Sequence, residues 1–197
     1  MPKTVEFWYE FASTYSYPAS MRVERLADEA GVSLKWRPFL LGPIFGAQGW
    51  NDSPFNIYPA KGQYMWRDMA RICEADGLAL NTPVRFPQNG LKAARIALLG
   101  ADEGWGGAFT RGVYLANFAE QKDISDDAVL GDVLASLGQN AADIVARANE
   151  DANKERLKVQ TQEAITRGIF GAPSFLVGDE LFWGNDRLED ALAWANR

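Results

Sequence analysis

The sequence predicts an α/β fold in which a βαβ unit and a ββα unit are separated by a long helical segment. Three observations support this prediction. Near the amino terminus, two short stretches of alternating apolar and polar residues flank an amphipathic stretch. From about Lys61 to Arg167 the apolar spacing is helical nearly throughout. Two short apolar runs and one more amphipathic stretch then close the chain.

The amino-terminal elements follow from periodicity. A strand is expected over residues 5–11, because apolar residues occupy every second position up to the stretch EFAS. The helix after it presents one apolar face and ends at Gly31, a residue type that commonly terminates helices. A second alternation over residues 32–37 is ended by Pro38. This order favours a parallel pair of strands with a right-handed crossover.

The middle and the end of the chain differ in pattern. NTPVRFPQNG (81–90) is the clearest loop among the helical segments, and Ser125 is expected to cap the helix that begins SDDAV. The runs PSFLV and ELFW are joined by Gly178-Asp179, which predicts a hairpin. Asn185-Asp186 then opens a final helix.

Without the helical block, the βαβ–ββα order is that of a thioredoxin-like module. We therefore expect a discontinuous thioredoxin-like domain at residues 1–45 and 168–197, and a loop plus helical insertion domain at 46–167.

Composition excludes several kinds of partner. The net charge is −6 and no Lys/Arg cluster is present, which argues against nucleic acid and anionic membranes. No apolar run approaches the roughly 20 residues of a membrane span. The amino-terminal MPKTVEFWYE lacks the apolar core of a signal peptide, so the expected compartment is the cytoplasm.

Two residue counts exclude further chemistry. The chain has no histidine, which removes Ser-His triads and His-ligated metals. It has one cysteine, which removes internal disulfides and cysteine-rich zinc sites, so no metal site is expected. Cys73 shares a helix face with Met69 and Ile72, as expected of a buried core thiol. Catalysis is left to hydroxyls, carboxylates, Lys/Arg, backbone dipoles or a borrowed reagent.

Ser13 and Ser16 lie at the first strand-to-helix junction, where a thioredoxin-type redox protein carries C-x-x-C. Ser13 has two interpretations. Its hydroxyl could cap the helix by accepting a backbone N–H. Alternatively, the hydroxyl and the positive helix end could hold a docked thiol as its thiolate. Ser13 as a nucleophile has no visible base.

Two further stretches each have a structural and a functional interpretation. In FGAPSF, Pro173 could simply open a strand. Alternatively, the Ala172–Pro173 bond is cis and the Ala172 backbone pairs with a peptide-like ligand near Ser13. In WGNDRLED, Asn185 and Asp186 either cap a helix or bind the ammonium and carboxylate of a ligand.

Five stretches together resemble a known family. They are FWYEFASTYSY, SPFNIYPAKGQYMWRD, RFPQNG…AAR, GIFGAPSFLVGDE and FWGNDRLE. In this order they resemble 2-hydroxychromene-2-carboxylate isomerases and kappa-class glutathione transferases, in the DsbA-like branch of the thioredoxin fold. The resemblance spans roughly residues 4 to 195, and its most specific part is IFGAPSFLVGDELFWGNDRL. It implies a thioredoxin-like module with a large all-helical insertion of the DsbA/kappa type.

The resemblance implies glutathione as the cofactor, with Ser13 contacting its cysteinyl sulfur. Thr14 replaces a proline that often follows this serine, which changes the rigidity of the turn. The Asn51–Lys61 spacing is one residue longer than in many relatives, which is a departure from the family pattern at Asn51. The other positions that match glutathione contacts are Ala172 and Pro173 at the cysteinyl unit, Asn185 and Asp186 at the γ-glutamyl end, and Asn51 and Lys61 in a loop.

The resemblance also implies an activity. We expect a glutathione-dependent isomerase that converts an aromatic α-keto acid between cis and trans forms by thiolate addition. The alternatives are a kappa-class-like glutathione transferase and a non-catalytic protein that binds glutathione or its conjugates. A dithiol oxidoreductase is excluded by the missing C-x-x-C. A homodimer is the assembly that the resemblance implies.

An aromatic substrate would lie in a cleft between the two modules, where ligand sites are common. Candidate walls are Trp50, Trp66 and Trp183. Arg95 is a candidate for binding the substrate carboxylate, and its alternative is a surface or helix-packing arginine.

Overall fold

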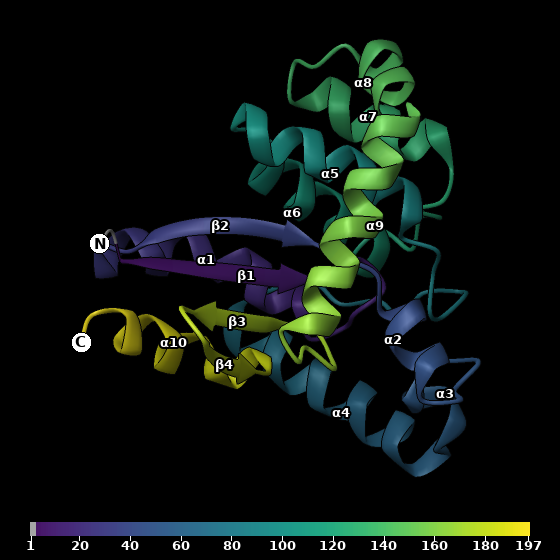
Figure 1. The fold of residues 1–197 in the computed structure, drawn as a ribbon. Coiled ribbons are helices and arrows are strands. Elements are labelled where there is room, and N and C mark those ends of the chain that lie inside the picture. The colour runs from purple at the N-terminus through teal and green to yellow at the C-terminus, as the bar shows by residue number, and fades with distance from the viewer. Residues whose placement is uncertain (1–2) are drawn as a thin grey trace.

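A computed structural model describes residues 3–197. Its sheet has four strands in the order β2-β1-β3-β4. The strand β1 (Thr4–Tyr9) is parallel to β2 (Ser33–Pro38) and antiparallel to β3 (Ser174–Val177). The strand β4 (Glu180–Trp183) completes a hairpin with β3. The sheet is therefore assembled from both ends of the chain, as Figure 1 shows.

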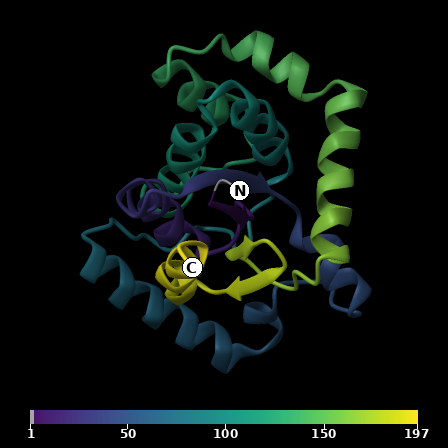
Figure 2. The same ribbon diagram turned by 60° about the vertical axis from the view of Figure 1, so that its left-hand side comes forward.

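Helices cover both faces of this sheet. Figures 1 and 2 show α5 to α8 gathered on one side of it and α4 on the other. The helix α1 lies between β1 and β2 in the chain and packs against α10. The α-helices are α1 (Ser16–Ala30), α2 (Leu41–Ala47), α3 (Pro54–Ile57), α4 (Pro59–Asp76), α5 (Leu91–Glu103), α6 (Gly106–Phe118), α7 (Asp127–Ser136), α8 (Ala141–Ala148), α9 (Asp151–Thr166) and α10 (Leu188–Ala195), and the short 3₁₀ helix η1 (Asn185–Arg187) precedes α10.

The core is centred on β1. The ring of Phe7 stacks on Phe175 at 5.3 Å and meets Trp36 edge-on at 5.3 Å between centroids. Both contacts follow from the register, which places Phe7 opposite these two residues on the neighbouring strands. Trp8, on the other face of β1, is also fully buried and packs against Phe39.

The alternating pattern predicts that one face of β1 is exposed, but Trp8 on that face is fully buried. Residues from the segment after β2 and from the end of α9 cover the second face of β1, including Phe39 and Ala164. A strand covered on both sides buries consecutive residues rather than alternate ones. The βαβ opening, the hairpin at 178–179 and the helical insertion of the predicted fold are confirmed.

Three local expectations are corrected. The first strand ends at Tyr9, because the chain then turns. Asp126, rather than Ser125, caps α7 by accepting the Ala128 N–H. The pair Asn185-Asp186 opens the 3₁₀ helix η1 rather than α10 itself. In addition, the helix α2 was not expected, and it spans residue 45. The division into domains at 1–45 with 168–197 and at 46–167 stays a prediction.

Within residues 3–197, no helix is long and apolar enough to cross a membrane.

Candidate active site

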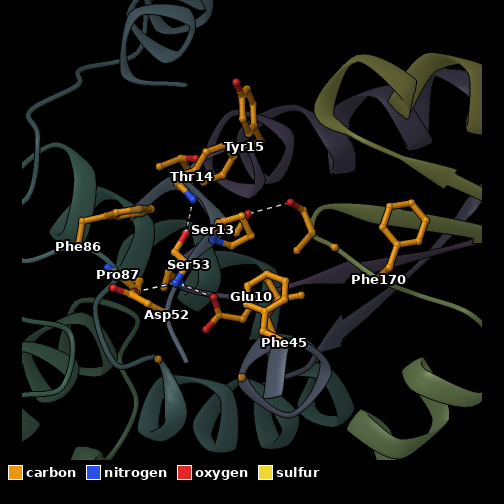
Figure 3. A pocket seen from close by; sticks show the side chains of 18 of the residues that line it. Glu10, Ser13, Thr14, Tyr15, Phe45, Asp52, Ser53, Phe86, Pro87 and Phe170 are labelled. Carbon is orange, nitrogen blue, oxygen red and sulfur yellow. Dashed lines mark hydrogen bonds between the residues drawn. The ribbon is translucent and has the colours of Figure 1, made fainter. Parts of the chain in front are cut away.

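A cleft of about 1400 Å³ lies where the two ends of the chain meet the helical insertion. Figure 3 shows this cleft from close by. Its walls are largely apolar, with a small number of polar and charged groups, which is the usual composition of a ligand pocket. The lining comes from the β1–α1 turn, the segment from the end of β2 to α4, the loop before α5, the approach to β3, and the β4–η1 turn.

Ser13 lies in the turn between β1 and α1. Its hydroxyl donates to the carbonyl oxygen of Ala172 at 3.0 Å, which Figure 3 marks with a dashed line. The Ser13 hydroxyl oxygen also accepts from the Ser16 hydroxyl at 3.0 Å and from the Ser16 N–H at 3.3 Å. Ser13 therefore accepts from the first residue of α1, as a cap would, and also joins that helix end to the approach to β3. The predicted thiolate contact stays a prediction.

The segment before β3 has the predicted backbone form. The Ala172–Pro173 peptide bond is cis. Ala172 lines the cleft with its carbonyl directed at Ser13, whereas Pro173 is buried behind it and accepts the Gly184 N–H at 3.0 Å. The cis geometry of this bond is therefore confirmed, and the pairing of Ala172 with a ligand stays a prediction.

Asn185 and Asp186 line the cleft, but neither side chain caps a helix. Asn185 is buried, and its Oδ1 accepts from Arg22 of α1 at 3.0 Å. Asp186 is exposed and lies 3.5 Å from the guanidinium of Arg187. The capping interpretation is therefore wrong for both residues. Their predicted contact with a ligand is untested.

Arg22 had no signal in the sequence, because it lies on an ordinary amphipathic helix far from the WGNDRLED stretch. In the fold it forms ion pairs with Asp76 of α4 and Glu189 of α10 while it holds Asn185. Arg22 thus fixes one wall of the cleft relative to α1.

Asn51 and Lys61 are both exposed and both line the cleft. The Lys61 ammonium lies 5.9 Å from the Tyr58 ring centroid. No salt bridge joins Lys61 to any other residue within 3–197, so its charge is available to an anionic ligand.

The aromatic walls differ in part from those expected. Trp50 and Trp183 line the cleft, and Trp183 packs against the exposed Phe170 with centroids 4.9 Å apart. Trp66 does not line it, because it packs edge-on behind Phe86. Arg95 lies outside the cleft and contacts Asn149, so its helix-packing alternative is the one found.

Glu10 is a cleft residue that sequence reasoning missed. It was treated as a polar position of the first strand, yet its side chain is 8 % exposed. Its Oε2 accepts the Ala12 N–H at 2.9 Å. Burial raises the pKa of this carboxyl to about 7, against the opposing effect of hydrogen bonds from the Ala12 and Ser13 amides. The sequence signal that could have identified Glu10 is a single acidic residue within the aromatic run WYEF.

The one cysteine of the chain lies away from this chemistry. Cys73 is buried in α4, and burial raises the pKa of its thiol to about 11. It does not line the cleft. The expected buried thiol is confirmed, and any sulfur that reaches Ser13 has to arrive with a ligand. Within residues 3–197, no group of three or more His, Cys, Asp or Glu side chains is arranged to hold a metal ion.

Replacing Cys73 with serine is expected to leave activity unchanged, because the thiol does not line the cleft. The free energy of unfolding should fall by about 1–2 kcal/mol, because the new hydroxyl would be buried without a hydrogen-bond partner. Urea unfolding and steady-state assays check both parts. Cys73→Ala is the matched control, since it removes the thiol without adding a polar group. Loss of activity in either folded variant would contradict an inert thiol.

Comparison with known proteins gives a consistent result. The family model described as DSBA-like thioredoxin domain matches residues 4–193. The chain is 30 % identical to a 2-hydroxychromene-2-carboxylate isomerase of Pseudomonas sp. (strain C18), over 93 % of this chain and 86 % of that protein. It is 26 % identical to glutathione S-transferase kappa 2 of Caenorhabditis elegans, over 94 % and 88 %. A solved 2-hydroxychromene-2-carboxylate isomerase aligns with a TM-score of 0.88 and 26 % identity, covering 98 % of this chain and 95 % of that one.

Proposed function

This chain belongs to the DSBA-like thioredoxin family, and we propose that within it the protein acts as a glutathione-dependent isomerase of the 2-hydroxychromene-2-carboxylate type. The observation that carries the proposal is the Ser13–Ala172 pair. A hydroxyl just before α1 is hydrogen-bonded to a backbone carbonyl in the lining of the cleft, and no cysteine lines that cleft. A thiol-bearing peptide would supply the one group that this site lacks.

The polar groups around the cleft fit glutathione. The carboxylate of Asp186 suits the ammonium of a γ-glutamyl unit, and the charge of Lys61 suits a terminal carboxylate. The Ala172 backbone offers peptide hydrogen bonds beside Ser13, where the cysteinyl unit would lie. The amides of Asn51 and Asn185 are further polar groups in the lining. Charges of both signs are thus available for a ligand that carries both.

Bound glutathione would supply a thiolate whose reversible addition to a conjugated carbon chain turns a double bond into a rotatable single bond. The chain's own part is electrostatic. The positive end of the α1 dipole favours an anion beside Ser13. The Ser13 hydroxyl can turn its hydrogen from the Ala172 carbonyl to a sulfur anion, which is the stronger acceptor.

The apolar walls would hold the aromatic part of the substrate. Phe170 and Trp183 form an exposed pair beside Ala172, and Phe45 packs against Trp50 with centroids 5.6 Å apart. Side chains of this kind bury a flat ring at little entropic cost. They also keep water from the reacting bond. The proposal places the protein in the cytoplasm, where thiols are kept reduced.

The test is an ultraviolet assay of the purified protein with trans-o-hydroxybenzylidenepyruvate, run with and without glutathione. Interconversion that requires glutathione is the expected result. S-methylglutathione is the matched control, because it keeps both charged ends of the peptide and has no free thiol. Turnover with this analogue, or no turnover with glutathione, would contradict the proposal.

The kappa-class relative makes a transferase the second candidate. The same cleft would then conjugate glutathione to an electrophile. An aryl halide offered with glutathione distinguishes the two activities, since only a transferase would form a stable thioether. Saturable glutathione binding with neither activity would indicate the binding-only alternative.

Replacing Asp186 with alanine is expected to weaken glutathione binding by about tenfold, since one charge-assisted contact would be lost. Isothermal titration calorimetry measures this change. Asp190→Ala is the matched control, because Asp190 also pairs with Arg187 but does not line the cleft. Equal affinities for Asp186→Ala and the unmodified protein would remove Asp186 from the glutathione site.

A further inference from the structure

We propose that Glu10 is the proton acceptor for the thiol held beside Ser13, so that the thiol proton stays inside the cleft. This inference rests on the proposed function and deepens it, because it names the group that generates the thiolate in a chain without histidine. It also gives a role to Glu10, which is buried and lines the cleft.

Position is the first argument. The carboxyl of Glu10 and the side chain of Ser13 belong to one tight turn, in which the Ser13 N–H donates to the Glu10 carbonyl at 2.9 Å. The carboxyl itself accepts the Ala12 N–H at 2.9 Å, and it lies near enough to the Ser13 amide for that amide to lower its pKa. Both side chains line the same cleft, as Figure 3 shows. A thiol seated on Ser13 is therefore close to an anchored carboxylate.

The second argument is that the groups described here around Glu10 are uncharged. The loop before α5 places Gly90 against it, where an added Cβ would lie 3.0 Å from Oε1. From α6, the Tyr114 hydroxyl donates to the Glu10 carbonyl oxygen, and Tyr9 of β1 is bonded to Thr110. Burial raises the pKa of both tyrosines, so both are neutral.

The charged groups of the cleft are the third argument. Glu10 has no salt-bridge partner within residues 3–197. The other charged residues that line the cleft are Asp52, Lys61, Asp68, Asp186 and Arg187. A buried carboxylate without a counter-ion gains by taking up a proton. Its proton affinity then approaches that of a thiol, which ordinarily titrates near about 8.5.

The transfer balances without another reagent. The S–H bond breaks, its electron pair stays on sulfur, and the proton binds a carboxylate oxygen of Glu10. The net charge of the cleft is unchanged, so no additional charge is buried. The neutral Glu10 no longer repels the thiolate, which two adjacent anions would do. When the thiol is re-formed, Glu10 returns the proton.

The test measures proton release and thiolate formation together. Glutathione is titrated into the protein at a pH of about 7.5, where a free thiol is about nine-tenths protonated. Calorimetry in buffers of different ionisation enthalpy counts the protons that reach solvent, and ultraviolet absorbance reports the thiolate. The expected result is a thiolate signal with release of close to zero protons. In Glu10→Gln, any thiolate that forms is expected to release close to one proton.

Each other outcome overturns the inference. A thiolate signal with about one proton released by the unmodified protein would reject the proton transfer and leave the proposed function intact. Binding without a thiolate signal would also reject the transfer. Absence of glutathione binding would reject the proposed function and the inference together. Asp52→Asn is the matched control, since it removes a cleft carboxylate outside the Ser13 turn and is expected to leave the proton count unchanged.

Discussion

Replacing Glu10 with glutamine is expected to stabilise the folded protein by about 3 kcal/mol at a pH of about 8. Burial raises the pKa of Glu10 from 4.5 to about 7, so between these values the folded state binds more protons than the unfolded state. The contribution of this group is therefore complete below the unfolded pKa and is lost as the pH rises through the folded one. Glutamine resembles the neutral acid and avoids that loss.

Urea unfolding of both proteins at two pH values checks the sign. The difference in unfolding free energy should be about 1 kcal/mol at a pH of about 5 and about 3 kcal/mol at a pH of about 8. Asp52→Asn is the matched control, because Asp52 is an exposed carboxylate that also lines the cleft. A Glu10→Gln difference that does not change with pH would mean that ionised Glu10 is not destabilising.

A carboxyl that destabilises the fold at neutral pH calls for a functional reason, because selection readily removes such a cost where nothing depends on it. Glutamine would keep the volume and an acceptor for the Ala12 amide. It would lose only the capacity to take up a proton. The stability gain and the loss of internal proton transfer therefore have the same physical origin.

Local pattern was enough to predict the framework that carries the site. Alternation located β1 and β2, and the turn residues Gly178-Asp179 located the β3–β4 hairpin. Local pattern was not enough for Trp8, whose burial depends on residues far along the chain that cover the second face of β1. Alternation of apolar and polar residues predicts that one face of a strand is buried. A second layer that covers the other face leaves no signal within the strand itself.

The same reasoning explains the site residues. Ser13, Ala172, Asn185 and Asp186 lie at element junctions, where turn chemistry marks a sequence, and the fold brings all four to one cleft. Arg22 lies mid-helix and acts through a long-range contact, so periodicity could not single it out. Glu10 was missed for a related reason, because a polar residue in a strand pattern is ordinarily exposed.

Replacing Ser13 with alanine is expected to lower turnover by about 10²–10³-fold and to change glutathione affinity by much less. The lost hydroxyl would donate to the sulfur anion more strongly than to the neutral thiol, so its removal raises the pKa of the bound thiol. Ultraviolet titration of bound glutathione measures that pKa directly, and steady-state kinetics separates kcat from KM.

Ser16→Ala separates this role from simple capping. The Ser16 hydroxyl donates to Ser13 and is not itself a lining group of the cleft, so its loss should leave the thiol pKa nearly unchanged. A capping role for Ser13 would appear as a loss of about 1 kcal/mol in unfolding free energy with an unaltered thiol titration. That combination would move the thiolate-holding role away from Ser13, because the dipole of α1 would then account for the anion without the hydroxyl.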